Sequence, residues 1–221
     1  MEEIGMRKLV KVLFTGFVLL CVCGVIVSQD KEFATEQNGW NLILVNEDYY
    51  ISKDYAVELT SFDNGEAVDY RIYEALQEMF NDAKDDNVYM FVAEGYRTQE
   101  DQQELFDDKV EEYQERVLLE FLARWKAKKW VAVPGTSEHQ LGLAVDINAD
   151  ISKSSSQEVY SWLANNAYKY GFIQRYPADK TEITGISYEP WHYRYVGEEV
   201  ASEIYEEKIC LEEYIDKKYD L

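Results

Sequence analysis

The only two histidines of this 221-residue chain, His139 and His192, lie in short motifs whose residue types suit a metal site. His139 belongs to the run S-E-H-Q-L-G-L-A-V-D, which ends at Asp146, and His192 closes the run E-P-W-H. Two histidines and an aspartate give three protein ligands and leave a fourth position open, as in catalytic rather than structural zinc sites. Glu189, three residues before His192, could take a proton from water at that position.

The first motif combines a turn with a strand. His139 and Asp146 are too far apart to share one turn of a helix, and Gly142 between them permits a sharp change of direction. Apolar residues alternate through Leu143–Asn148, so this run predicts a strand with Asp146 pointing away from its apolar face. Taken alone, the pair fits a surface histidine and a turn aspartate equally well.

The second motif is extended rather than helical. Pro190 fixes its own backbone and biases Glu189 toward an extended conformation, unlike a helical metalloprotease motif. Residues 191–196 are rich in β formers and predict a strand on which His192 and Arg194 share a face. Glu189 would then approach the metal from the preceding turn. The alternative is a solvated glutamate beside a core histidine.

A third motif, G-Y-R-T, follows the predicted strand Val88–Ala93 and contains Arg97. A guanidinium at the end of a strand can hold a carboxylate or a developing oxyanion. If this segment stood alone, an ordinary surface salt bridge would explain the arginine.

The remaining patterns indicate the elements that position these motifs. Strands and helices mix without regular alternation, which predicts an α+β fold with a small, mostly antiparallel sheet flanked by helices. The zinc motifs would then lie on neighbouring strands or at their ends. The other expected elements are a first packed segment at 40–45, a helix over 66–83, one or two helices within 98–128, a helix from the serines at 154–156 to Gly171, and a final amphipathic helix from Gly197.

The N-terminus predicts a membrane anchor. An uncharged run, Val12–Val27, follows the basic residues Arg7, Lys8 and Lys11. We expect an uncleaved transmembrane helix with its N-terminus in the cytoplasm and the domain outside; a cleaved signal peptide is the second reading and a buried core helix the third. The expected segments are a basic stub and anchor or signal peptide at 1–28, a linker at 29–39 and the domain that contains the zinc motifs at 40–221.

Charge and cysteine content narrow the partners. The net charge is −21, so the domain as a whole should be repelled by nucleic acid and by anionic membranes, and solubility is the simplest reason for the charge. Cys21 and Cys23 lie in the apolar run, which leaves Cys210 alone and excludes a disulfide within the domain. We expect a monomer with no nucleic-acid partner.

Together the motifs G-Y-R-[ST] with a later glutamine, S-x-H-x-x-G-x-A-x-D and E-P-W-H resemble the zinc D-alanyl-D-alanine carboxypeptidases and dipeptidases of glycopeptide resistance and cell-wall maturation. The resemblance runs from about Trp40 to the C-terminus and implies the small α+β zinc fold shared with the Hedgehog signalling domain. It implies zinc bound by His139, Asp146 and His192, with Glu189 as the catalytic base.

The resemblance also implies further site residues and an activity. Arg97 would assist the transition state or hold the substrate, Gln102 and Ser137 would contact the peptide terminus, and Tyr176 would contact the substrate. The expected reaction is removal of the C-terminal D-alanine from a peptidoglycan stem peptide or its precursor. The open alternatives are an L,D-carboxypeptidase acting on tetrapeptide stems, a D,D-dipeptidase, and a zinc-binding module that has lost catalysis.

Overall fold

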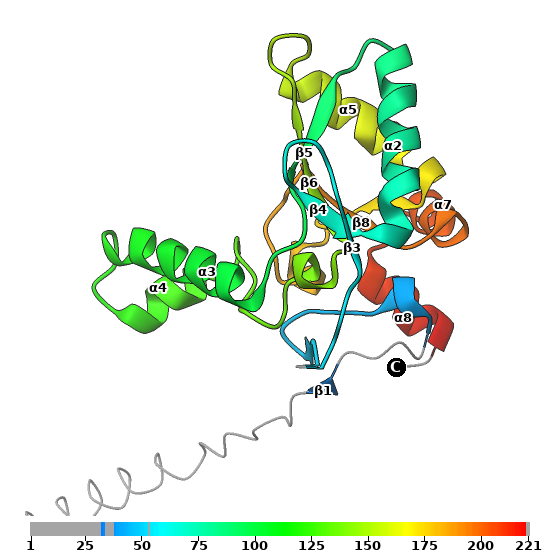
Figure 1. The fold of residues 1–221 in the computed structure, drawn as a ribbon. Helices are drawn as coiled ribbons and strands as arrows, with labels where there is room; N and C mark the ends of the chain where they lie inside the picture. The colour runs from blue at the N-terminus through cyan, green and yellow to red at the C-terminus, as the bar shows by residue number, and fades with distance from the viewer. Residues whose placement is uncertain (1–31, 34–37, 53, 220–221) are drawn as a thin grey trace, which may run out of the picture. The chain divides into compact units, whose positions relative to one another are not determined.

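The computed structural model describes residues 32–33, 38–52 and 54–219 (Figure 1). These residues belong to one compact unit, Glu32–Leu221. The expected anchor at 1–28 and most of the expected linker lie outside the described residues. Among the helices that are described, none is both long and apolar enough to cross a membrane.

A four-stranded antiparallel sheet carries the site. Its strand order is β5-β6-β8-β7, so β6 and β8 lie side by side at its centre. In the register of this sheet, Asp146 faces His192 on β8 and Glu94 on β5. This is the neighbourhood that the two motifs required. The strands are β5 Met90–Glu94, β6 Ala144–Ala149, β7 Phe172–Gln174 and β8 His192–Tyr195.

The main core lies between this sheet and helix α2, Tyr70–Asp85. Ile72, Leu76 and Met79 of α2 belong to one buried cluster with Val145 and Ile147 of β6. The cluster also contains residues of α5, Ser156–Asn166. Its N-cap is Ser155, which forms a capping box with Glu158, as the serine-rich run predicted. The 3-10 segment η3, Ala167–Tyr170, then ends at Gly171.

Helix α2 begins later than the sequence predicted. The first residues of the predicted helix form β4, Ala67–Asp69, which pairs antiparallel with β3, Leu59–Ser61. Val68 suits either pattern, but its backbone pairs with Thr60, and the Asp69 side chain then caps α2 by accepting from the Arg71 amide. A smaller parallel pair joins β1, Glu32–Phe33, to β2, Tyr49–Tyr50, and the predicted packed segment near Trp40 begins as the 3-10 turn η1, Trp40–Leu42.

The charged stretch at 98–128 forms two helices that pack on each other. Helix α3 is Gln99–Gln114 and helix α4 is Glu120–Ala127, and we call this pair the α3–α4 arm. The arm extends to one side of the four-stranded sheet (Figure 1). It has a small buried cluster of its own, formed by Phe106, Val110, Ala123, Ala127 and Val131.

The chain ends in two helices rather than the single helix predicted from Gly197. Helix α7 is Glu198–Glu207 and helix α8 is Leu211–Tyr219, after the short helix α6, Thr181–Thr184. The break follows Lys208, whose φ of 56° is left-handed and ends α7. Ile204 and Ile215 join both helices to β7 through Ile173 in a second buried cluster.

Candidate active site and metal centre

Three side chains from three elements converge on one point. His139 comes from the 3-10 turn η2, Glu138–Leu141, Asp146 from β6 and His192 from β8. One candidate ligand atom from each lies within 4.8 Å of the others. Oδ1 of Asp146 is 3.4 Å from Nε2 of His139 and 3.0 Å from Nδ1 of His192. The structure therefore brings together the three residues that the spacing selected.

The atoms that face this point suit a metal cation. The His139 ring lies with Nδ1 2.7 Å from the carbonyl oxygen of Gly95, so Nδ1–H donates there and the Nε2 lone pair faces Asp146. Oδ1 of Asp146 is buried, and no hydrogen bond within the described residues satisfies it. A buried carboxylate oxygen between two ring nitrogens is normally compensated, and zinc accepts this set of ligands. The residues fit zinc.

A buried charge cluster supports the second histidine. Nε2 of His192 lies 3.8 Å from Oε2 of Glu138, whose other oxygen accepts hydrogen bonds of 2.8 Å from both Arg175 and Arg194. Arg175 also binds Glu212 through two hydrogen bonds of 2.8 and 2.6 Å. Burial alone would raise the pKa of Glu138, but the two guanidinium groups hold it well below its usual value. Glu138 is thus a permanent anion behind His192.

Sequence reasoning missed the members of this cluster as functional residues. Two of them had usable signals: Glu138 directly precedes His139, and Arg194 shares the predicted strand face of His192. Nothing in the sequence pointed to Glu212, which lies on α8. Metal-binding histidines typically have a carboxylate next to the ring nitrogen that does not bind the metal, and here the Glu138 carboxylate lies 3.8 Å from Nε2 of His192.

Glu189 lies next to the three candidate ligands in a nearly dry position. It is 7% exposed, and its Oε2 lies 3.8 Å from Nδ1 of His192. Its backbone amide donates to the Tyr176 carbonyl and its carbonyl accepts from the His192 amide, which fixes the turn that leads into β8. Burial raises the pKa of Glu189 to about 7. A carboxyl group with a pKa near neutrality is suited to accept and return a proton.

Arg97 binds Asp146 directly and is not an ordinary surface ion pair. Its Nη2 lies 3.2 Å from Oδ2 of Asp146, its Nη1 donates to Gln102 at 3.2 Å, and its Nε donates to Glu94 at 3.3 Å. The amide group of Gln102 in turn donates to the Ala132 carbonyl at 2.8 Å. The amide oxygen of Gln102 is therefore occupied by Arg97 and its amide nitrogen by Ala132. A direct contact of Gln102 with substrate stays a prediction.

Two positions in the motifs require glycine, each for a different physical reason. A Cβ on Gly95 would collide with the backbone carbonyl of Ala67, because β4 passes directly against this position. That approach lets the Tyr96 amide donate to the same carbonyl at 2.6 Å. Gly142 has a φ of 71°, and a Cβ there would lie 2.9 Å from the Asp69 amide nitrogen. The predicted turn between His139 and Asp146 therefore depends on glycine.

All eight residues predicted for the site border one cavity of about 400 Å³. The Tyr176 ring lies 4.8 Å from the His192 ring, and Ser137 is buried at the start of η2. The outer wall adds Trp130 and Trp191, which are apolar surfaces for a longer ligand. The eight residues are Arg97, Gln102, Ser137, His139, Asp146, Tyr176, Glu189 and His192.

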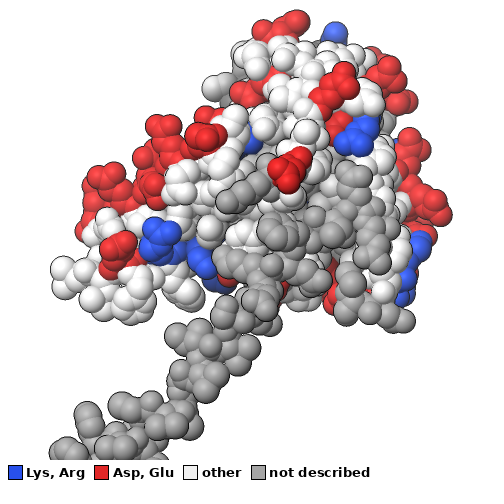
Figure 2. Space-filling model, turned by 60° about the horizontal axis from the view of Figure 1, so that its bottom comes forward, with Lys and Arg blue, Asp and Glu red and all other residues white. Residues whose placement is uncertain are grey.

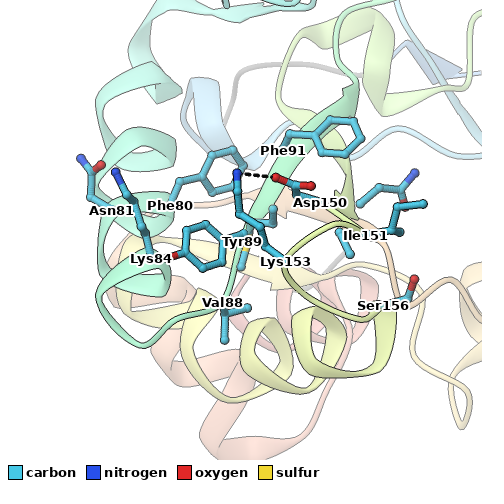
Figure 3. Close-up of a pocket in the computed structure, with 13 residues that line it drawn as sticks. Phe80, Asn81, Lys84, Val88, Tyr89, Phe91, Asp150, Ile151, Lys153 and Ser156 are labelled. Atoms are coloured by element: carbon cyan, nitrogen blue, oxygen red, sulfur yellow. Dashed lines mark hydrogen bonds and ion pairs between the residues drawn. The ribbon is translucent and has the colours of Figure 1, made fainter.

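A second cavity lies away from this chemistry. It has a volume of about 700 Å³ and is formed by the end of α2, the start of β5 and the loop after β6 (Figure 3). Its charged groups include Lys153 and Asp150, which bind each other at 2.6 Å. None of the eight site residues borders it.

The fold and the site define an α+β protein in which two histidines and an aspartate could hold a metal ion. Residues 65–198 match the family model VanY, D-alanyl-D-alanine carboxypeptidase. The chain is 57% identical over 186 residues to a D-alanyl-D-alanine carboxypeptidase of Enterococcus faecalis. The alignment covers 84% of this chain and 69% of that protein. The chain therefore belongs to the VanY family, and it is a zinc-dependent D-alanyl-D-alanine carboxypeptidase.

Solved structures agree with this assignment. The VanYB complex with D-alanine-D-alanine has a TM-score of 0.80 at 57% identity and covers 81% of this chain and 99% of that chain. A VanY D,D-pentapeptidase variant from a VanB-type resistance cassette, in complex with Zn(II), has a TM-score of 0.78 at 58% identity and covers 80% and 99%. The LD-carboxypeptidase LdcB has a TM-score of 0.67 at 35% identity and covers 86% and 96%.

Proposed function

We propose that the enzyme removes the C-terminal D-alanine from peptidoglycan stem pentapeptides or their precursors. The observation that carries this proposal is the position of Glu189, whose carboxylate lies 3.8 Å from His192 and whose pKa is raised to about 7 by burial. A poised base beside a His-Asp-His set is the arrangement needed for hydrolysis of a peptide bond. The relative solved with D-alanine-D-alanine supports the choice of terminal dipeptide.

His139, Asp146 and His192 would hold the zinc ion through Nε2, Oδ1 and Nδ1. When bound, zinc supplies a Lewis acid for a carbonyl oxygen and makes water acidic enough to act near neutral pH. Glu189 accepts the proton of the attacking water on its carboxylate and donates it to the nitrogen of the departing D-alanine. The peptide C–N bond breaks as the new C–O bond forms, and Glu189 returns to its ionised form.

Arg97 holds the catalytic geometry and faces the substrate. Its guanidinium is fixed by Asp146 and Gln102, so its remaining N–H groups are presented to the cavity without a large loss of side-chain entropy. We propose that its positive charge stabilises the negative charge that develops on the scissile carbonyl oxygen, or else binds the terminal carboxylate. Ser137 and Tyr176, which border the same cavity, would contact the peptide.

Three peptides test the proposal. A synthetic pentapeptide stem ending in D-Ala-D-Ala should lose one alanine by mass, and a chelator should abolish the loss. A tetrapeptide stem tests the L,D-carboxypeptidase, and free D-Ala-D-Ala tests the dipeptidase. Preference for either of these would replace the proposed substrate, and loss of alanine from none of them would favour the inactive zinc-binding module.

We also propose that residues 1–28 anchor the enzyme in the cytoplasmic membrane with the catalytic domain outside. The proposal rests on the basic residues that precede the uncharged run Val12–Val27. Protease added to intact protoplasts should digest the domain, whereas protection would favour an intracellular enzyme. N-terminal sequencing of the mature protein separates an anchor from a cleaved signal peptide.

A further inference from the structure

The tip of the α3–α4 arm exposes an unusual set of large apolar side chains. Leu118 is fully exposed, Phe121 is 65% exposed and Trp125 is 57% exposed, and Leu119 and Leu122 beside them are also exposed. Positions 118, 121, 122 and 125 recur at helical spacing, and Ala123 packs on α3 from the other side of α4. An apolar stripe that faces water at the tip of a projecting arm indicates a binding surface.

Positive charge accompanies this stripe in an otherwise acidic chain. Residues 116–130 contain five basic residues and a single carboxylate, whereas the whole chain carries a net charge of −21. Arg124, Lys126 and Lys129 form no ion pair within the described residues. Arg124 and Lys126 lie over the rings of Phe106 and Tyr113 of α3, at 5.1 and 5.9 Å. Lys129 lies 6.0 Å from the ring of Trp125 in the stripe and also donates to the Gly185 carbonyl.

Acidic side chains lie on a different edge of the arm. In Figure 2, red side chains follow the upper edge of the arm, and uncharged atoms with blue side chains occupy its lower edge. Helix α3 supplies most of the acidic groups and α4 most of the basic ones. An acidic domain with one basic, apolar tip would approach an anionic surface by that tip alone, because charges farther away than about 10 Å are screened.

We propose that α4 and the loop before it bind the surface of an anionic phospholipid bilayer. Helix α4 has eight residues and is about 12 Å long, so it is suited to lie in the interface and is too short to cross it. Leu118, Phe121 and Trp125 insert at the boundary between headgroups and acyl chains, and the cationic groups of Arg124, Lys126 and Lys129 contact lipid phosphates. The net negative charge of the chain predicts repulsion from an anionic bilayer, but the local charge of residues 116–130 is positive.

The arm also reaches the catalytic cavity from its other side. Trp130, just after α4, borders the cavity together with Lys109 of α3. An arm seated on lipid would place the cavity mouth beside the bilayer surface. This favours a stem peptide attached to a membrane carrier over one deep in the wall.

The test uses residues 32–221, which form one compact unit. The solved VanYB chain, which matches 81% of this chain over 99% of its own length, has this fold without a counterpart of the remaining residues. Sedimentation with vesicles of phosphatidylglycerol should recover the protein, and vesicles of phosphatidylcholine should not. A triple Arg124→Gln, Lys126→Gln, Lys129→Gln variant should lower binding about a hundredfold, on the scale of one surface cation each.

The apolar contribution has its own variant and control. A triple Leu118→Ser, Phe121→Ser, Trp125→Ser variant should also lose binding, while Phe91→Ser with Ile151→Ser, which are exposed elsewhere, should bind like wild type. Hydrolysis of a soluble pentapeptide should be unchanged in all of them. Wild-type binding by either triple variant, or no preference for anionic lipid, would overturn the proposal. So would an α4-dependent dimer in sedimentation velocity without vesicles, which would make the stripe a contact between copies.

Discussion

Asp146 faces His192 across the β6–β8 ladder, with 3.0 Å between Oδ1 of the aspartate and Nδ1 of the histidine. Each of the two side chains also has a neighbour of opposite charge on the side away from this contact. Arg97 binds Oδ2 of Asp146, and Glu138 lies next to Nε2 of His192. The ligand atoms therefore have little freedom to turn away from the metal position, and variants of the supporting groups separate their roles.

Glu189→Gln should retain zinc and the fold but lower kcat by about 10²- to 10⁴-fold, because an amide cannot accept the proton of water. Turnover of a pentapeptide stem, together with the metal content of the purified variant, measures this. Glu182→Gln, on the exposed face of α6, is the matched control and should be fully active. A Glu189→Gln enzyme with more than a tenth of the wild-type rate would show that the base lies elsewhere.

Arg97→Ala should lower kcat/KM about a hundredfold when assayed at saturating zinc, with the melting temperature nearly unchanged. Arg97→Lys should restore little of the rate, since a single ammonium group cannot reproduce the forked contacts to Asp146 and Gln102. Arg116→Ala removes an exposed ion pair with Glu112 and is the control. Near-normal rates for both Arg97 variants would assign Arg97 to the scaffold.

Glu138→Gln should weaken zinc binding about 10- to 100-fold, because the group that orients His192 loses its charge. It should also cost about 3–5 kcal/mol of unfolding free energy, since Arg175 and Arg194 would share a neutral amide. Chelator competition and denaturant unfolding give the two quantities. Glu212→Gln is the informative control, because it weakens the same arginine cluster without touching His192. Equal losses of zinc affinity in both variants would reduce Glu138 to a purely structural role.

Zinc binding at pH 8 should release about one proton. In the metal-free protein, burial alone would lower the pKa of His192, but Asp146 and Glu138 raise it to about 9, so His192 is protonated at pH 8. Glu189, with a pKa of about 7, is already ionised, and burial lowers the pKa of His139. Because the proton must leave His192 before Nδ1 can ligate, zinc affinity should fall as the pH falls below about 9. Calorimetry in buffers of different ionisation enthalpy counts the proton, and a count of zero at pH 8 would contradict this.

The sequence predicted the residues of the candidate site better than it predicted the buried charged residues that surround them. Motif chemistry selected three residues that the structure brings to one point, and the alternation along 143–148 correctly turned Asp146 away from the apolar core. The sequence did not predict the charge cluster around Glu138. Glu212, one of its members, comes from α8, and no local pattern links residues so far apart in the chain. A residue that is buried only by tertiary packing gives no signal in its own neighbourhood.

The errors in secondary structure have local causes. Val68 fits both a helical and a strand period, and only its pairing with Thr60 decides between them. Strand β7 has three residues, too few for a periodic signal, and depends on its partner β8. Lys208 adopts a left-handed conformation that lysine rarely takes, so the break between α7 and α8 had no marker.

The position of β8 also sets the order in which a newly made chain can become an enzyme. Its residues come last in the chain among the strands of this sheet, and His192 follows Asp146 by 46 positions. A ribosome that has finished the first motif has therefore made only two of the three metal ligands, and two ligands hold zinc poorly. We therefore expect a product that stops before residue 192 to bind zinc weakly. Zinc content thus reports that translation passed residue 192 and that β8 took its place in the sheet.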